Sequence, residues 1–444
     1  MRGKTGAPAT RDTIFALATA PGRAGVAVVR VSGPLAEAGI RHLTGIDAIP
    51  ERKAVVRTLF DLSTNDRIDT GIVLFFREPH SYTGENIAEF QIHGGRAAQT
   101  ALLSALGKLP GFRPAEAGEF TRRAVENGRL DLTQAEAIAD LVAAETDVQR
   151  RQALRQHDGE LSGLYEGWRS RLIRAAAWIE ASIDFADEEI PGDAVAKSRK
   201  EIGDVRAEII AHLNDGRRGE ILRDGLQIAV IGPPNVGKSS LVNALARRDV
   251  AIVSEQPGTT RDVIEVHLDL GGYAVILADT AGLRHASDGV EQEGMRRARA
   301  RAESADLRIL VRDGTAADEG AFIPHLRGGD ITVWNKADIA ARKTKPGLWV
   351  SARTGEGLAD LVEVLSKEAA KRVSGGEGPI LTRARYRYAL EEAAESLGFV
   401  GPTVDPELSA EHVRRALRAI GRITGRVDLD ELLDVVFRDF CIGK

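Results

Sequence analysis

The chain of 444 residues has little cysteine and no long apolar run, and both shortages exclude whole classes of protein. Its single cysteine, Cys441, excludes an internal disulfide and a metal site built from several cysteines, which fits a reducing cytoplasm. No stretch reaches the ~18–20 apolar residues that a membrane-spanning helix needs. Residues 1–10 mix Arg, Lys, Gly and Pro without an apolar core, unlike a secretory signal. We therefore expect a cytoplasmic protein that has no membrane partner.

A net basic charge is also missing. The formal net charge is −5, so no overall positive field attracts nucleic acid. An RNA partner would have to meet a local basic surface, which the Arg-rich segments 169–174 and 414–418 could supply. A solvated helix face is the simpler interpretation of each segment taken alone.

Composition and pattern divide the chain into three predicted domains. With 43% hydrophobic and 28% charged residues it is a globular protein, and its length calls for two or three domains. Residues 1–125 carry short β-branched runs between Gly/Pro turns, which predict an α/β domain. Helical periodicity dominates residues 126–222 and 375–444, whereas residues 223–374 alternate strands with helices like a P-loop domain. We therefore predict a multidomain α/β + α protein whose P-loop domain is inserted into a helical domain.

Capping patterns predict where two helices of the helical domain begin. Thr133-x-x-Glu136 opens the first of them, and Asp428-x-x-Glu431 opens the last. Between them, apolar residues from Leu161 to Ile183 recur with a helical period and predict one long helix.

Residues 232–239 have the sequence Gly-Pro-Pro-Asn-Val-Gly-Lys-Ser, which matches the P-loop pattern G-x-x-x-x-G-K-S. An apolar strand precedes the loop and a helix follows from Ser240, as the motif requires. The glycines allow backbone N–H groups to wrap phosphates at a helix N-terminus. Lys238 is expected to reach the β- and γ-phosphates, and the Ser239 hydroxyl to ligate Mg²⁺. A plain strand–helix turn is the alternative, and the motifs downstream argue against it.

Four motifs downstream complete a guanine-nucleotide site. Residues 258–262 offer a threonine to Mg²⁺ and the γ-phosphate, and residues 279–282, Asp-Thr-Ala-Gly, can sense the loss of that phosphate. In residues 335–338, Asn-Lys-Ala-Asp, the last carboxylate can accept hydrogen bonds from the N1–H and 2-amino groups of guanine, a pattern that adenine lacks. Residues 351–353, Ser-Ala-Arg, close the base pocket; Arg353 stands where Lys is more usual, which we expect to matter little because backbone groups make the contact. The predicted GTP-binding residues are Asn235, Val236, Gly237, Lys238, Ser239, Ser240, Ser254, Thr259, Thr260, Asp279, Thr280, Ala281, Gly282, Asn335, Lys336, Asp338, Ser351, Ala352 and Arg353.

Hydrolysis at this site calls for its own way of holding water and of neutralising charge. Leu283 follows the last switch glycine and cannot orient a water as the glutamine of Ras-type enzymes does. Glu291 is a candidate for that task, with a solvated residue in the charged run 288–293 as the equal alternative. No arginine finger is obvious, so Asn235 could coordinate a monovalent cation together with carbonyls of residues 254–259. A loop-stabilising asparagine is the alternative.

Motifs outside the nucleotide site carry a family resemblance. They are Asp12-Thr-Ile, Pro21–Val26, Arg30–Gly33, Ser81–Glu85, His93–Gly95, Gly118–Ala124 and the ending Phe440-Cys-Ile-Gly-Lys444. Together they resemble the MnmE (TrmE) tRNA-modification GTPases over about residues 12 to 444. The Cys-Ile-Gly-Lys ending behind an inserted GTPase domain is the most specific of these motifs.

The resemblance implies an N-terminal domain that binds a tetrahydrofolate derivative (5,10-methylene or 5-formyl) and forms a homodimer. It implies Mg²⁺-dependent, K⁺-stimulated GTP hydrolysis by GTPase domains that pair across this dimer. Family members work in a heterotetramer with an FAD-dependent MnmG-like protein, and FAD belongs to that partner. Together they install an aminomethyl or carboxymethylaminomethyl group at C5 of the wobble uridine of certain tRNAs, with the folate supplying a carbon.

The resemblance also assigns roles to individual residues. The folate-binding positions are Arg30, Glu85, Arg129 and Lys444, and Arg129 replaces a Lys of many relatives. The K⁺-binding positions are Asn235, Ser254, Gln256 and Thr259. Ser239 and Thr260 match the Mg²⁺ ligands, and Glu291 matches the catalytic glutamate.

Cys441 is the second candidate catalytic residue. As a thiolate it could act as a nucleophile or an acid–base group in uridine chemistry. The negative end of a helix dipole disfavours a thiolate there, so Lys444 or a substrate would have to compensate. A small buried apolar residue is the alternative, and the chemical step of Cys441 stays open.

Two other functions compete with uridine modification. A ribosome-assembly GTPase would share the nucleotide motifs, although the C-terminal helices lack the Gly-x-x-Gly loop of a KH-type RNA-binding domain. A dimerisation-gated switch without modification chemistry is the weaker alternative.

Overall fold

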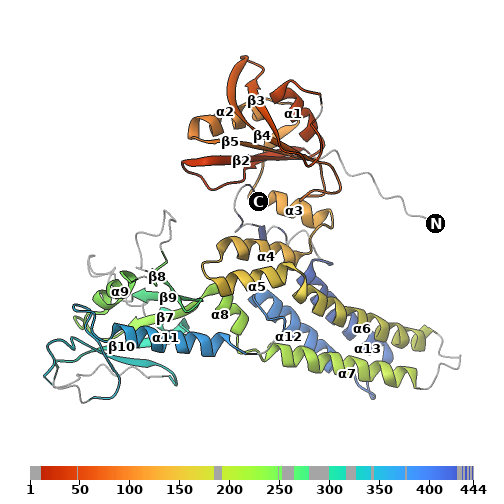
Figure 1. The fold of residues 1–444 in the computed structure, drawn as a ribbon. Helices are drawn as coiled ribbons and strands as arrows, with labels where there is room; N and C mark the ends of the chain where they lie inside the picture. Colours follow the sequence, from red (N-terminus) through yellow and green to blue (C-terminus); the bar gives the residue numbers. More distant parts are fainter. Residues whose placement is uncertain are drawn as a thin grey trace, which may run out of the picture. The chain divides into compact units, whose positions relative to one another are not determined.

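The computed structural model describes residues 12–47, 49–184, 193–248, 250–252, 265–279, 300–316, 327–341, 345–375, 378–427, 433, 436–437, 440 and 443. Figure 1 shows their helices and strands. The chain forms two compact units, Met1–Ala139 with Gly421–Lys444, and Asp140–Ile420. The domain boundaries expected from the sequence stay predictions.

A six-stranded sheet organises the first unit. Its order is β3-β4-β5-β2-β1-β6, and its neighbours are antiparallel except β1 with β6. The strands are β1 (Thr13–Leu17), β2 (Ala24–Ser32), β3 (Val55–Asp61), β4 (Asp66–Phe76), β5 (Ile87–Gly94) and β6 (Phe112–Pro114). The helices are α1 (Ala36–Thr44), α2 (Arg96–Gly107) and α3 (Glu119–Glu126).

The two faces of this sheet bury different sets of side chains. Val29 and Val31 of β2 pack in the core with residues of α1 and α2. Ile14 and Ala16 of β1 point to the other face, where Phe120 of α3 covers them. Because side chains alternate along a strand, residues 30 and 32 of β2 lie on the face of α3.

The helix α4 (Leu132–Ala143) begins earlier than its sequence predicts. Asp131 Oδ1 accepts from the backbone N–H of Gln134 at 2.9 Å, and Gln134 Oε1 accepts from the N–H of Asp131 at 3.0 Å. Thr133 lies inside the helix and donates to Asp131. The predicted cap at Thr133 is therefore wrong by two residues, because the overlapping pattern Asp131-x-x-Gln134 is the one that brings Leu132 into the buried core. The predicted cap at 428–431 lies outside the described residues.

Six helices, most of them long, form the described helical part of the second unit, and Figure 1 shows several of them side by side. They are α5 (Asp147–His157), α6 (Glu160–Asp184), α7 (Ala194–Leu213), α8 (Arg218–Asp224), α12 (Ala384–Gly398) and α13 (Pro406–Thr424). The predicted long helix over residues 161–183 is confirmed as α6. Helix α7 contacts both α6 and α12, around the fully buried rings of Tyr165 and Tyr386.

A second six-stranded sheet has the order β12-β11-β10-β7-β9-β8. It is parallel except for β8, which pairs antiparallel with β9. Its strands are β7 (Leu226–Ile231), β8 (Glu265–Leu270), β9 (Tyr273–Asp279), β10 (Leu307–Asp313), β11 (Ile331–Asn335) and β12 (Leu348–Trp349). Helices α9 (Lys238–Ala246) and α11 (Leu358–Val373) contribute to its apolar core.

Candidate functional site

The predicted nucleotide motifs follow the carboxyl ends of parallel strands of the second sheet. The loop 232–237 follows β7, Asn335 ends β11, and Ser351 follows β12. Strand β7 lies between β10 and β9, where the order of the parallel strands reverses direction. Ligands of open α/β sheets bind at such a switch point, outside the carboxyl ends of the strands.

The backbone of the P-loop requires glycine at two positions. Gly232 has φ +147°, and a Cβ there would collide with the carbonyl oxygen of Val311. Gly237 has φ +91°, and a Cβ there would collide with the side-chain nitrogen of Asn335. Asn235, with φ +63°, also lies in the left-handed region, which asparagine tolerates. Other residues at the glycine positions would therefore distort the loop.

Lys238 lies at the start of α9, with its side chain folded over the loop. Its Nζ donates to the carbonyls of Gly232 at 2.9 Å and Pro233 at 2.8 Å. Ser239 and Ser240 belong to the first turn of the same helix, whose dipole favours an anion. A cation, the N–H groups of the first helical turn and a hydroxyl thus lie together as a phosphate site requires.

Asn335 connects the P-loop, residues 232–237, to the loop 351–353, which we call the base loop. Its Nδ2 donates to the carbonyl of Val236 at 2.9 Å, and its Oδ1 accepts from the N–H of Ala352 at 3.1 Å. The side chain is 3% exposed, so neither hydrogen bond competes with bulk water. One buried amide therefore holds both ends of the candidate nucleotide site in register.

Asp338 presents its carboxylate between two partners in the base loop. Its Oδ1 accepts from the hydroxyl of Ser351 at 2.8 Å, and its Oδ2 is 2.8 Å from Nη2 of Arg353. The Ser351 hydroxyl, and Arg353 after it, hold the pKa of Asp338 below its usual range. The Arg353 side chain is thus engaged with the carboxylate of Asp338, a contact that the sequence pattern does not indicate.

Asp313, the last residue of β10, contacts the Asn-Lys-Ala-Asp motif, although no sequence motif singles it out. Its Oδ2 lies 2.6 Å from Nζ of Lys336, which has φ +66°. Burial opposes ionisation of Asp313, but hydrogen bonds from Lys336 and Thr315 outweigh it and lower the pKa. A polar residue at the end of a strand beside β11 was the available signal, since Asp313 pairs with Asn335 in register.

Several predicted residues lie outside the described part of the chain. They are Ser254, Gln256, Thr259, Thr260, Thr280, Ala281, Gly282, Glu291, Cys441 and Lys444. Asp279 ends β9, and its side chain lies outside the described part as well. The structure therefore leaves these assignments as predictions.

In the first unit, Arg30 and Glu85 come together on the α3 face of the sheet. Arg30 of β2 donates to Glu89 at 2.9 Å, and its guanidinium lies 5.3 Å from the ring centre of Tyr82. Glu85 accepts from the hydroxyl of Ser32 at 2.8 Å, two residues along the same strand. Both predicted residues are therefore positioned from one face of β2.

The third predicted residue of this group, Arg129, lies beside the same loop. A Cβ on Gly84 would approach the Cγ of Arg129 to 3.2 Å, which shows how closely the two residues pack. Asn127 donates to the carbonyl of Thr83 at 2.7 Å and holds the segment after α3 against the loop. The loop 83–85 thus lies between β2 and the chain that follows α3.

Arg123 is the central cation of this cluster, and the sequence analysis misses it. Its Nη1 lies 3.1 Å from Glu85 and its Nη2 2.9 Å from Glu119, while the residue is 4% exposed. Arg113 contacts the same Glu119 at 2.6 Å. Hydrogen bonds from both arginines overcome burial and lower the pKa of Glu119. Glu85 therefore belongs to a buried ionic network and is not a lone acceptor.

Gly443 brings the C-terminal tail to the edge of this group. Its φ is +100°, and a Cβ there would collide with the carbonyl of Leu17 at the end of β1. Leu17 pairs with Val29, the neighbour of Arg30. Only glycine fits this approach, which gives Gly443 of the C-terminal motif a structural reason.

Comparisons with known proteins match both the N-terminal and the helical parts. The model "GTP-binding protein TrmE N-terminus" matches residues 13–129, and "MnmE helical domain" matches residues 132–441. The "tRNA modification GTPase MnmE" of Parvibaculum lavamentivorans is 53% identical and covers 98% of this chain and 100% of the relative. The protein of that name from Paramagnetospirillum magneticum is 52% identical, with the same coverage. The chain belongs to the MnmE family of tRNA modification GTPases.

Membership of the MnmE family confirms the predicted fold class, an N-terminal domain and a helical domain combined with a P-loop GTPase. It also confirms that the chain is a GTP hydrolase of tRNA modification. Among solved structures, the G domain of the T. maritima FeoB iron transporter is 29% identical and covers 33% of this chain and 98% of that chain. Its TM-score is 0.25, so this likeness carries no argument.

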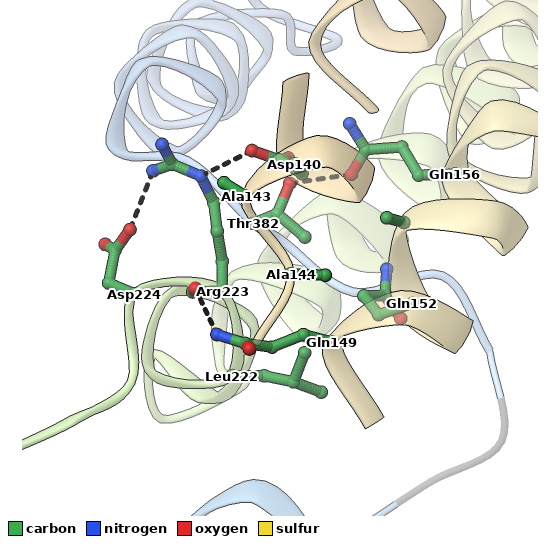
Figure 2. Close-up of a pocket in the computed structure, with 11 residues that line it drawn as sticks. Asp140, Ala143, Ala144, Gln149, Gln152, Gln156, Leu222, Arg223, Asp224 and Thr382 are labelled. Carbon is green, nitrogen blue, oxygen red and sulfur yellow. Dashed lines mark hydrogen bonds and ion pairs between the residues drawn. The ribbon is translucent and has the colours of Figure 1, made fainter. Parts of the chain in front are cut away.

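The MnmE-type chain also contains a cavity of ≈ 150 Å³ beside α8, the helix that leads into β7 (Figure 2). Arg223 of α8 contacts Asp140 of α4 at 3.0 Å and Asp224 at 2.9 Å. Arg383 contacts the same Asp140 at 2.6 Å, just before α12. Burial raises the pKa of Asp224 despite Arg223. These contacts tie both crossings between the helical and GTPase parts to α4.

Two further observations concern metals and membranes. Among the described residues no group of three or more His, Cys, Asp or Glu side chains could hold a metal ion. Within the same part of the chain, no helix combines the length and the apolar character that a bilayer crossing needs.

Proposed function

We propose that the carboxyl edge of the second sheet binds GTP, with Asp338 reading the guanine and the P-loop holding the phosphates. The main support for this proposal is the position of Asn335, whose side-chain amide forms hydrogen bonds to both the P-loop and the base loop. A carboxylate that accepts two N–H groups selects guanine, because adenine has no such pair of donors on that edge. This geometry supports the part of the predicted GTP-binding set that lies in residues 235–240 and 335–353.

At the phosphate end, the residues of this chain fit a metal-assisted site. Ser239 and Thr260 would hold Mg²⁺, which neutralises charge on the phosphates. Asn235, an exposed residue in a left-handed loop position, would hold K⁺ together with Ser254, Gln256 and Thr259. Glu291 orients the attacking water in place of the Ras-type glutamine. Lys238, already bonded to two P-loop carbonyls, meets the β- and γ-phosphates.

In the first unit, Arg30, Glu85, Arg129 and Lys444 form the site for a tetrahydrofolate derivative. The donor set fits such a ligand: Glu85 can accept from a pterin ring, Tyr82 offers an aromatic face, and the cations can meet a glutamate tail. The homodimer acts in the cytoplasm with an FAD-dependent MnmG-like partner as a heterotetramer. It modifies C5 of the wobble uridine in certain tRNAs, with Cys441 near the reacting base.

The decisive experiment is nucleoside analysis of tRNA from cells that lack this protein. Loss of C5-substituted wobble uridines, restored by the wild-type gene, supports the proposal. Normal levels of these nucleosides in the deletion strain would reject uridine modification and favour the ribosome-assembly alternative, which would show as accumulated ribosomal precursors.

Replacing Na⁺ by K⁺ tests the cation site separately. GTP turnover should rise strongly in K⁺, because a fixed cation beside the phosphates stabilises the charge that develops in the transition state. Asn235→Ala should remove the difference between the two salts while Asn243→Ala, an exposed residue on α9, retains it. Equal turnover of the wild type in both salts would reject the K⁺ assignment.

A further inference from the structure

Both carboxylate oxygens of Asp338 have a protein partner in this structure. Ser351 is fully buried, donates to Oδ1 and accepts from the N–H of Thr354 at 3.1 Å, so its hydroxyl is fixed. Arg353, on Oδ2, differs: its side chain is 77% exposed. Ser351 is therefore a fixed partner of the carboxylate, whereas the exposed Arg353 side chain, called the arm below, can move away from it.

The arm and the expected ligand offer the same chemistry. A guanidinium carries N–H donors on a planar carbon, and the N1–H and 2-amino groups of guanine form a similar N–C–N edge. Oδ2 of Asp338 is one of the two acceptors that this edge needs. Arg353 Nη2 lies 2.8 Å from Oδ2, where the base must also donate, so base and arm compete for the space beside this oxygen.

We propose that Arg353 is a displaceable stand-in for guanine, an affinity-setting residue that holds Asp338 before the nucleotide binds and leaves it when the base enters. This inference rests on the proposed role of Asp338 in reading guanine. It concerns the side chain of Arg353, whereas the established pattern of the pocket uses backbone groups of the same loop.

The stand-in lowers nucleotide affinity by a predictable amount. If the pocket is open only for part of the time, the apparent Kd is the intrinsic Kd divided by the open fraction. Exposed ion pairs contribute ~0.2–1 kcal/mol, so the expected reduction in affinity is about 1.5- to 5-fold. The reduced affinity should appear as a lower association rate constant, because the Arg353 side chain must leave Asp338 before the base can enter.

The test compares Arg353→Met with the wild-type full-length chain, using GDP with a fluorescent ribose label on nucleotide-free protein. The variant should bind about 1.5- to 5-fold more tightly, mainly through faster association. Lys367→Met is the matched control, since it removes an exposed cation 2.6 Å from Glu363 on α11 and should leave the Kd unchanged. Equal or weaker binding by Arg353→Met would overturn the inference, because the arm would then be idle or in favourable contact with the base.

Salt provides a second readout, because screening weakens an exposed ion pair. The Debye length falls from ~10 Å at 0.1 M to ~3 Å at 1 M ionic strength. The ratio of the wild-type Kd to that of Arg353→Met should therefore fall toward one as an inert salt is added. A ratio independent of salt would contradict competition for the Asp338 carboxylate.

A double-mutant cycle separates this inference from the proposed function. Asp338→Asn should weaken GDP and accept xanthosine diphosphate, since an amide can donate to the C2 carbonyl of xanthine. In that background Arg353→Met should no longer alter the Kd, because the carboxylate partner is gone. If Asp338→Asn changes the affinity for neither GDP nor xanthosine diphosphate, the base pocket itself is misassigned. If Asp338→Asn acts as expected but Arg353→Met has no effect while Asp338 is present, only the stand-in inference fails.

Discussion

The candidate nucleotide site and the candidate folate site are built from different materials. At the nucleotide site, loops after parallel strands supply backbone N–H and carbonyl groups, and Asn335 links them with two hydrogen bonds. At the folate site, side chains from β2, the loop 83–85 and α3 form an ionic network around Arg123. The conformation of the first site depends mainly on backbone groups of the loops, whereas that of the second depends on buried charged side chains.

This difference predicts how the two sites fail. A polar residue of the nucleotide site such as Asn335 can be removed while the strands beneath it stay paired, because the apolar core of the sheet does not include it. Glu85 and Glu119 both pair with Arg123, which is buried inside the first unit. Ligand binding and folding are therefore coupled at this site. Mutations should therefore separate affinity from stability at one site and not at the other.

Arg123→Met should give the largest effect. Removing one partner from a buried ionic network costs ~3–5 kcal/mol, because the remaining charges are left uncompensated. Hydrogen exchange read by mass spectrometry should show lost protection in β1 and β2, together with lost folate binding. Arg122→Met, on the same helix and paired with Glu126 at 3.0 Å, is the control and should change protection little. Unchanged protection in Arg123→Met would show that the network does not stabilise the unit.

Asn335→Ala should give an intermediate effect confined to binding. The two buried hydrogen bonds hold the loops in the binding conformation, so losing about 1–3 kcal/mol of this support should weaken GTP binding about 5- to 150-fold. The affinity for GDP should fall equally, since Asn335 holds loops that are expected to contact both nucleotides. Calorimetry measures both affinities, with Asn243→Ala as a neutral control. Lost exchange protection in β7 and β10 would contradict the separation of affinity from stability.

The same contrast explains what the sequence could predict. Residues 232–239 are contiguous, and their chemistry needs one strand–loop–helix setting, which β7 and α9 provide. Arg123 is 38 residues from Glu85 and Asp313 is 23 residues from Lys336, so only the fold brings each pair together. Neither residue carries a local pattern that distinguishes it from a solvated charge.

Local patterns also failed where two of them overlapped. Asp131-x-x-Gln134 and Thr133-x-x-Glu136 both satisfy the capping rule, and only the burial of Leu132 selects the first. Arg353 is a related case, since its backbone role was expected and its side-chain contact with Asp338 depends on how the loop 351–353 folds back.

Arg30→Lys should give the smallest effect and tests the independence of the two sites most directly. The substitution keeps the charge but loses the Nε bond to Glu89 and the flat contact with Tyr82 and Phe120, at 5.3 and 5.8 Å. A cation–π contact at a partly exposed site contributes ~0.5–1 kcal/mol, so the Kd for a reduced folate should rise about two- to fivefold in calorimetry. Arg67→Lys, on the exposed end of β4, should leave folate binding unchanged. The Kd for GTP should stay the same in both variants, because a side chain on β2 contributes nothing to loops held by Asn335. A matching loss of GTP affinity in Arg30→Lys would mean that the two sites are energetically coupled, and the contrast between a backbone-built site and a charge-built site would then need a physical connection between them.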